Sequence, residues 1–233
     1  MNKVVISLGG SILVKDEDDA SYIRELVILL NELGPDNVFI VITGGGRTAR
    51  KYIGIGRDLG ANESLLDSIG IQATLLNAWT MISAMGDGVY PRPVTSIEEA
   101  IIGASMNGIS VGGGTHPGHT TDTVAALTAE RWGADLFLNL TAVSGAYTSD
   151  PNRDDDAEQI PKMTSSELLE LVSSTRRGAG SHSVLDPLAS AIVHRAAIRT
   201  CILDGRDLSS VRAAIQGEKF DGTVVVPNRD GGM

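Results

Sequence analysis

VGGGTHPGHTTDTVAA, residues Val111–Ala126, joins a short β-branched run to an apolar helical pattern that begins at Val124. Its glycines let the backbone approach a ligand closely, because they lack a Cβ atom. The free N–H groups at the start of the following helix attract anions. Histidines, threonines and an aspartate add hydrogen-bonding groups between two hydrophobic elements. The stretch therefore predicts a strand, a polar ligand-binding loop and a helix in succession.

On both sides of this loop, strand-like and helix-like segments alternate. Continuous apolar runs are typical of strands buried on both faces, and they occur at Asn37–Thr43 and Asp135–Thr141. Shorter β-branched or apolar segments predict further strands at Lys3–Leu8, Ile109–Val111, Ile198–Leu203 and Thr223–Val226. Helical spacing or capping signals indicate helices at Tyr22–Leu33, Arg47–Leu59, Ser64–Met85, Ser96–Ser105, Asp122–Trp132, Leu168–Val172, Asp186–Ala197 and Asp207–Gln216. The alternation predicts one α/β domain over residues 1–233, a three-layer sandwich with a mainly parallel sheet and helices on both faces.

The overall composition narrows the class of protein. A net charge of −10 argues against a surface that binds nucleic-acid phosphates. No apolar run reaches the length of a membrane span, and the N-terminal MNKVVISLGG has no signal-peptide pattern. The single Cys201 cannot form an internal disulfide and fits a reducing compartment. We therefore expect a cytoplasmic protein without nucleic-acid or membrane partners.

Four of the expected strands end in polar or glycine-rich turns. Parallel strands place their carboxyl ends at one edge of the sheet, where ligands bind. Glycine amides at that edge form a cradle for phosphates, and Arg47, Arg50 and Lys51 add positive charge beside a helix N-terminus. Any one Gly-Gly pair is equally compatible with an ordinary turn, so the four turns together favour a phosphate site. They are Gly9–Ser11, Gly44–Arg47, Gly112–Thr121 and Thr141–Asp150.

Other signatures are absent or incomplete. The P-loop pattern G-x-x-x-x-G-K-[ST] does not occur, and Gly54–Gly60 differs from a dinucleotide fingerprint because no strand precedes it. His116 and His119 have no second pair of residues at metal-ligand spacing. We therefore assign no metal ligand to the protein itself.

Six segments together resemble the amino acid kinase superfamily, and within it the archaeal-type uridylate (UMP) kinases. They follow in the same order over nearly the whole chain, as KVVISLGGSIL, VITGGGRTARKYI, GIQATLLNA, GGTHPGHTTDTVAAL, LTAVSGAYTSDP and SVLDPLASAIV. The GGTHPGHTTD block is the most specific of them, whereas many kinases of the superfamily share the GGS and GGG turns.

The resemblance implies a function and an assembly. It implies transfer of the γ-phosphoryl group of ATP to UMP, giving UDP and ADP for pyrimidine nucleotide biosynthesis, with Mg²⁺ as cofactor. The acceptor-binding part would cover residues 1–130 and the ATP-binding part residues 131–227. The assembly would be a homohexamer built as a trimer of dimers. The apolar stretch Leu65–Met85 independently favours oligomerisation, because it exceeds what one surface helix needs for its own core.

The resemblance also implies roles for individual residues. ATP would contact Gly9, Gly10, Gly45, Arg50, Thr141, Tyr147 and Asp150, and UMP would contact Gly44, Asp67, Gly114, Thr115, His116, Pro117, Gly118, His119, Thr120 and Thr121. Arg50 is the catalytic candidate, because phosphoryl transfer depends on positioning and charge neutralisation. Asp67 suits the ribose of UMP, since a carboxylate accepts hydrogen bonds from both hydroxyls of a diol.

Two departures from the superfamily pattern keep alternatives open. Many members carry Lys at the position of Ser7, where it meets the transferred group, and Asp or Asn at the position of Ala142. One alternative is another small-molecule kinase of the same fold, such as an isopentenyl phosphate kinase, although those kinases carry a His after the GGG turn that this chain lacks. The other is a non-catalytic protein that binds nucleotides or oxyanions.

Overall fold

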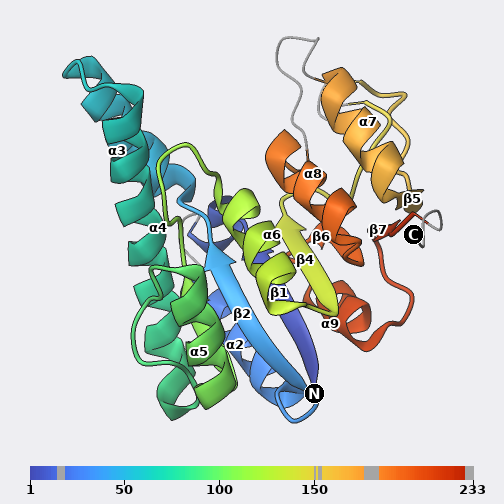
Figure 1. The fold of residues 1–233 in the computed structure, drawn as a ribbon, viewed down its shortest axis with the longest axis horizontal. Coiled ribbons are helices and arrows are strands. Elements are labelled where there is room, and N and C mark those ends of the chain that lie inside the picture. The colour runs from blue at the N-terminus through green and yellow to red at the C-terminus, as the bar shows by residue number, and fades with distance from the viewer. Residues whose placement is uncertain (15–18, 150, 152–153, 176–183, 229–233) are drawn as a thin grey trace.

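A computed structural model describes residues 1–14, 19–149, 151, 154–175 and 184–228 (Figure 1). Within these residues, seven strands form one sheet in the order β3-β2-β1-β4-β6-β7-β5. The strands are β1 (Asn2–Leu8), β2 (Asn37–Thr43), β3 (Ile109–Gly112), β4 (Leu136–Thr141), β5 (Lys162–Thr164), β6 (Thr200–Asp204) and β7 (Thr223–Val226). The five strands from β3 to β6 in this order pair in parallel, whereas β7 pairs antiparallel to β6. The expected mainly parallel sheet is confirmed.

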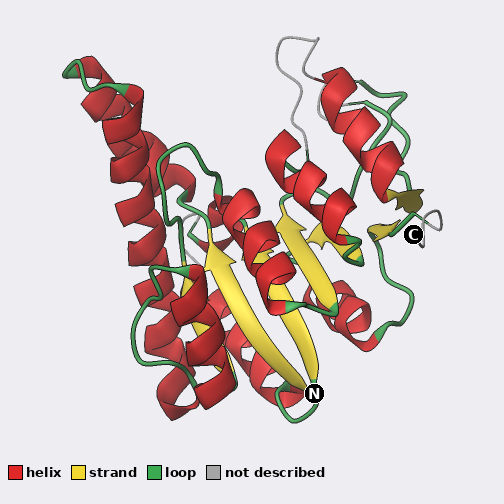
Figure 2. Cartoon of the chain, in the orientation of Figure 1, coloured by secondary structure: helices red, strands yellow, loops and turns green. Residues whose placement is uncertain are grey.

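Helices cover both faces of the sheet (Figure 2). They are α1 (Gly10–Leu13), α2 (Asp19–Leu33), α3 (Gly46–Asp58), α4 (Glu63–Met85), α5 (Ile97–Asn107), α6 (Thr121–Trp132), α7 (Ser165–Thr175), α8 (Pro187–Ala196) and α9 (Leu208–Gln216), with a 3-10 turn at Gly86–Gly88. Helices α2, α4 and α9 pack on one face, and α5 to α8 pack on the other. The predicted three-layer α/β sandwich is therefore confirmed.

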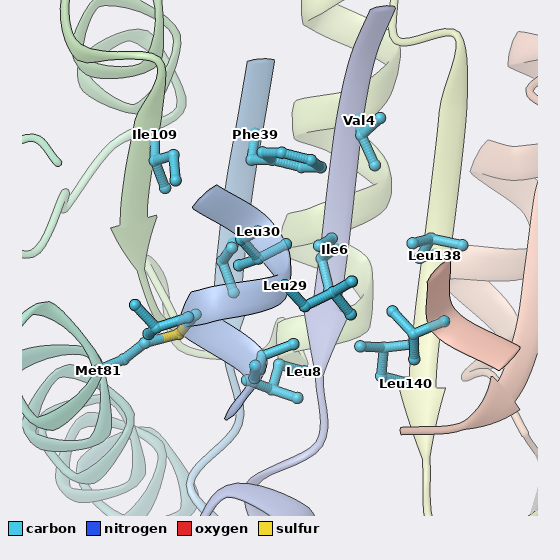
Figure 3. Packing of buried hydrophobic residues seen from close by; sticks show 14 of the residues in the cluster. Val4, Ile6, Leu8, Leu29, Leu30, Phe39, Met81, Ile109, Leu138 and Leu140 are labelled. Carbon is cyan, nitrogen blue, oxygen red and sulfur yellow. The ribbon is translucent and has the colours of Figure 1, made fainter. Parts of the chain in front are cut away.

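Alternate residues of each strand enter different halves of the core, because successive side chains point to opposite faces. Val4, Ile6 and Leu8 of β1 join the cluster on the α2 face, whereas Val5 joins the cluster on the α6 face. Figure 3 shows the α2 side, where Leu29 and Leu30 of α2 and Met81 of α4 meet the strands. Each fully buried aliphatic side chain of this kind contributes about 1.5–3 kcal/mol of transfer free energy.

Side-chain caps set several helix starts. Thr164 and Glu167 form a complete capping box before the helix predicted at Leu168–Val172, since the Thr164 hydroxyl accepts from Glu167 N at 3.2 Å and the Glu167 carboxylate accepts from Thr164 N at 2.6 Å. The box predicted at Ser96 is modified. Ser96 Oγ accepts from Glu99 N at 3.1 Å, but the Glu99 carboxylate accepts from the N–H of Thr95 instead of that of Ser96.

Two short elements, α1 and β5, were not predicted from the sequence. Strand β5 contains only Lys162–Thr164 and exists as the partner of β7, so its three residues carry too little periodicity to indicate a strand. Helix α1 follows Gly9 directly and spans four residues.

The order of the strands defines one functional edge. From β1 the chain proceeds to β2 and β3 on one side, and then to β4 and β6 on the other side. The switch point between β1 and β4 is where open α/β sheets bind ligands, at the carboxyl ends of their strands. The turns predicted to bind phosphate after Leu8, Thr43, Gly112 and Thr141 all lie at this edge.

Candidate active site

The turns after β1 and β2 lock together at the carboxyl edge. Gly44 N donates to Leu8 O at 2.8 Å, and a Cβ atom on Gly10 would lie 2.3 Å from Gly46 N. A Cβ atom on Gly44 would lie 2.6 Å from Gly10 N. Because each backbone occupies the space that a side chain would need on the other, both positions require glycine. The two turns therefore form one compact, amide-rich corner.

Polar side chains of α4 hold the neighbouring turns in place. Thr74 Oγ1 accepts from Gly114 N at 2.8 Å, and Asn77 Nδ2 donates to Gly44 O at 2.7 Å. Thr43 Oγ1, at the end of β2, lies 2.9 Å from Thr74 O and 3.0 Å from Gly112 O. Thr74 and Asn77 are buried, so α4 presents two buried polar side chains to these turns. Sequence reasoning missed both residues, although a Thr and an Asn within a long apolar helix were a detectable signal.

Asp67 closes the acceptor loop against α4. Its Oδ2 accepts from Gly118 N at 2.7 Å, and Gly118 has a φ of +85°. The bond joins two residues that are 51 positions apart and that were both assigned to the acceptor. A carboxylate has further lone pairs after accepting one bond, so Asp67 retains acceptor capacity for ribose hydroxyls.

The rest of the loop Gly114–Thr121 lies open to solvent. His116, Pro117 and His119 are exposed, and the two imidazole rings stand 6.4 Å apart. Gly114 is buried and Thr115 is half-buried. The loop therefore offers accessible rings and backbone groups beside Asp67.

Ser7, at the end of β1, forms a hydrogen bond with a buried acid. Ser7 Oγ donates to Asp122 Oδ1 at 2.6 Å. Desolvation raises the pKa of Asp122 to about 6; the Ser7 hydrogen bond opposes this rise and the nearby Asp186 charge adds to it. A buried carboxylate with a raised pKa beside a glycine-rich edge is typical of a functional site. Sequence reasoning included Asp122 in the GGTHPGHTTD block but gave it no role.

Asp186 connects the starts of two helices at the same edge. It caps α8 by accepting from Leu188 N at 2.8 Å and Ala189 N at 3.0 Å. It also accepts hydrogen bonds from the hydroxyls of Thr120 and Thr123. The predicted N-cap is confirmed, and the structure adds its link to α6. The hydroxyl of Thr120, which we assigned to UMP, is engaged in this link and in capping α6.

The turn after β1, which carries Gly9 and Gly10, contacts the end of β4. Gly9 N donates to Leu140 O at 2.9 Å, which brings the β1 turn to the residue before Thr141. Tyr147 is half-buried and forms a bridge with Gln159. Asp150, the last residue assigned to ATP, lies outside the described residues.

The positive charges stand on α3. Gly45 precedes α3, and Arg47, Arg50 and Lys51 follow with exposed side chains. Arg50 lies in the second turn of this helix, which begins directly after Gly44 and Gly45. Its position is compatible with the predicted catalytic role, which stays a prediction.

Two surface cavities lie away from the carboxyl edge of the sheet. Two cavities of about 460 and 480 Å³ lie on the surfaces of β5 with α7 and of α9. Among the described residues, no group of three or more His, Cys, Asp or Glu side chains is placed to hold a metal ion. None of the described helices is long and apolar enough to cross a membrane.

The fold and the edge define a kinase of a known family. Residues 2–204 match the model of the amino acid kinase family, and the chain belongs to this family. The uridylate kinase of Methanospirillum hungatei is 42% identical over 228 residues, which are 98% of this chain and 96% of that protein. The uridylate kinase of Pyrococcus abyssi is 40% identical over 225 residues, covering 97% and 100% of the two chains. The crystal structure of uridylate kinase from Archaeoglobus fulgidus superimposes with a TM-score of 0.87 at 39% identity, covering 96% and 100%.

Proposed function

We propose that this protein is a uridylate kinase that transfers the γ-phosphoryl group of ATP to UMP, giving UDP and ADP. One observation carries the proposal: the hydrogen bond from Gly118 N to Asp67 brings the GGTHPGHTTD loop to α4, beside the glycine corner at the β1 and β2 ends. The full-length similarity to uridylate kinases supports the same function. The function belongs to pyrimidine nucleotide biosynthesis.

The acceptor half is assigned to α4 and the loop after β3. Asp67 accepts hydrogen bonds from the ribose, and Gly44 with the residues Gly114, Thr115, His116, Pro117, Gly118, His119, Thr120 and Thr121 surrounds UMP. Thr74 fixes the start of the loop in this half, because its hydroxyl accepts from Gly114 N at 2.8 Å. The acceptor-binding part comprises about residues 1–130.

The donor half is assigned to the turn after β1 and the end of β4. Gly9, Gly10 and Gly45 supply amides for the ATP phosphates, and Thr141, Tyr147 and Asp150 surround the nucleoside. Amides held in place before the reaction stabilise developing charge without reorganisation. The ATP-binding part comprises about residues 131–227.

The chain's own groups supply most of the catalytic effect by positioning and electrostatics. Arg50 neutralises phosphate charge from the acceptor side, and the Ser7–Asp122 pair occupies the place of the usual superfamily Lys. Mg²⁺ bound to ATP would neutralise charge on the phosphates. Magnesium in such sites is held by phosphates, water and one or two carboxylates, and Asp122 is the carboxylate of this edge that fits that role.

A turnover assay tests the function. Purified protein with ATP and Mg²⁺ is offered UMP, CMP, dUMP, AMP and isopentenyl phosphate, and ADP release is measured. We expect UMP to be phosphorylated with the highest kcat/KM. Preference for isopentenyl phosphate would assign a different kinase of this fold, and binding without any phosphorylation would leave a nucleotide-binding protein.

We also propose that copies of the chain associate through α3 and α4. The helices project from the sheet at the upper left of Figure 1, and they expose Tyr52, Ile55, Leu59, Leu65, Leu76 and Trp79. Leu65 and Leu76 are about three helical turns apart and lie with Trp79 along one side of α4. A second copy offers the same apolar stripe and therefore covers this one. We propose that these contacts build a hexamer as a trimer of dimers. We also propose a cytoplasmic location, where the buried Cys201 stays reduced.

A further inference from the structure

We propose that Arg206 is a positioning residue for the donor nucleotide, acting through the backbone of Thr141 and Ala142. The inference rests on the proposed function, which assigns Thr141 to the ATP site. It concerns residues that follow β6, a part of the chain to which no role in the site was assigned.

The first step is that Arg206 is held in one orientation. Its Nε lies 2.8 Å from Asp204 Oδ1 and 3.0 Å from Asp204 Oδ2, and its own backbone N–H donates to Asp204 Oδ1 at 2.9 Å. A second guanidinium nitrogen, Nη2, also bonds the carboxylate. Partial burial acts to raise the pKa of Asp204, but the hydrogen bonds from Arg206 and its charge together lower that pKa below its ordinary value. A bidentate pair of this kind fixes the plane of the guanidinium.

The second step is that the fixed guanidinium holds the end of β4. Arg206 Nη2 donates to Ala142 O at 2.9 Å, and Gly205 N donates to Thr141 O at 3.0 Å. These two bonds hold successive carbonyl groups at the place where the chain leaves the sheet toward Tyr147. Ala142 has no polar side chain of its own with which to fix this turn, so the guanidinium of Arg206 takes that role.

The third step is that the same segment contacts the phosphate side. A Cβ atom on Gly205 would lie 2.9 Å from Leu140 Cβ and 3.0 Å from Ile12 Cδ1, so the segment approaches both β4 and α1 closely. Tyr22 OH donates to Gly205 O at 2.9 Å, which joins α2 to the same point. Burial and the charge of Asp204 raise the pKa of Tyr22, so its hydroxyl stays a donor. Asp204, Gly205 and Arg206 thus form one connected segment, which we call the brace. The brace sets the distance between the Gly9–Gly10 turn and the Thr141 turn.

The chain provides a matched control for this brace. Arg195 at the end of α8 forms an equivalent bidentate pair with Glu130 of α6, with Nε 2.8 Å from Glu130 Oε1. Arg195 is about as exposed as Arg206, with 57% against 49% of the side chain accessible. Its pair joins two helices on the far side of the sheet and contacts no strand end of the donor half. Loss of that pair therefore removes a similar surface interaction without touching the proposed brace.

The test compares Arg206→Ala, Arg206→Lys and Arg195→Ala with the unaltered chain. The Kd of MgATP and the Kd of UMP are measured separately by calorimetry, and the KM of each substrate is measured in turnover. We expect Arg206→Ala to raise the Kd and KM for ATP about tenfold while those for UMP change less than twofold. Arg206→Lys should recover part of the loss, and Arg195→Ala should leave both substrates unaffected. A melting temperature within a few degrees of the unaltered chain checks that each variant folds.

The outcomes separate the two proposals. If the unaltered chain binds MgATP and Arg206→Ala binds it equally well, the role of Arg206 is wrong. Equal weakening of ATP and UMP would also overturn it, because a positioning role specific to the donor predicts a difference. If the unaltered chain binds no MgATP, the proposed function fails instead.

Discussion

Ser7 Oγ donates a hydrogen bond to Asp122 Oδ1 over 2.6 Å, across 115 positions of the chain. The side chain of Ser7 points to the face of the sheet that α6 covers. Val5, two residues earlier in β1, is buried on that face, and residues two apart in a strand point the same way. Asp122 meets it from the first turn of α6. This pair connects the central strand to the helix that follows the loop Gly114–Thr121.

Substitution Ser7→Ala should raise the pKa of Asp122 above its value of about 6. The hydroxyl stabilises the ionised carboxylate, and one hydrogen bond to a charged group is worth about 1.5 kcal/mol, or about one pH unit. Carboxyl-carbon NMR titration measures the shift. Ser110→Ala is the control, because Ser110 is also buried in a strand but donates to a backbone carbonyl, Ala100 O. An unchanged Asp122 titration would contradict the assignment.

Substitution Asp122→Asn should stabilise the protein at neutral pH while lowering its activity. The pKa of Asp122 is raised from 3.8 to about 6, so folding favours its protonated form. Its contribution is fully favourable below pH 3.8 and is lost as the pH rises through about 6. At pH 7 the charge therefore costs up to about 3 kcal/mol, which Asn would remove.

Urea unfolding at several pH values tests this prediction. The gain of the Asn variant should be largest at pH 7 and should vanish near pH 4. A variant that is less stable at pH 7 would show that the carboxylate makes favourable contacts that exceed its desolvation cost. A fully active variant would remove Asp122 from the site.

Substitution Asp67→Ala should raise the KM for UMP about tenfold or more, with a much smaller effect on ATP, since a hydrogen bond to a charged group is worth about 1.5–3 kcal/mol. The change also releases Gly118 N, which Asp67 holds at 2.7 Å. Steady-state kinetics with each substrate varied in turn measure the difference. Glu63→Ala, one turn earlier on α4, is the control. An equal effect on both substrates would exclude Asp67 from the acceptor half.

Substitution Arg50→Ala should lower kcat by roughly 10- to 100-fold, because a guanidinium that neutralises the transferred phosphoryl group acts mainly in the transition state. Arg57→Ala, on the same helix, should retain kcat, since Arg57 forms an exposed pair with Glu63. Single-turnover rates at saturating ATP and UMP compare the two variants. An Arg50→Ala enzyme with normal kcat would leave Arg47 and Lys51 as the candidates for the catalytic cation.

Substitution Trp79→Glu should dissociate the proposed assembly, because it introduces a charge into the apolar stripe of α4. Trp79 is 51% exposed in the single chain, and Ile28 on α2 is 56% exposed. Ile28→Glu is therefore a control of similar exposure outside the stripe. Light scattering coupled to size exclusion measures the mass of each variant. A Trp79→Glu protein of unchanged mass would place the contact elsewhere.

Several features of this protein follow from its sequence alone. The β-branched run at Lys3–Leu8 and the continuous apolar run at Asn37–Thr43 predict buried strands, and Asp186-Pro187 predicts the start of α8. These signals are local, because a strand or a cap depends on neighbouring residues. The glycine turns at one edge also follow, since a parallel sheet brings its carboxyl ends together.

The tertiary structure decided which distant residues meet. Ser7 with Asp122, Gly118 with Asp67, and Arg206 with Ala142 are separated by 115, 51 and 64 positions. No local pattern encodes such pairs, because they depend on strand order and on the rotation of α4 and α6 about their axes. Burial beside Ser7 makes Asp122 an acid with a raised pKa, whereas the same residue in an open helix start would be an ordinary charge. The sequence alone thus determined the edge of the sheet that carries the site, and the packing across it decided which side chains act there.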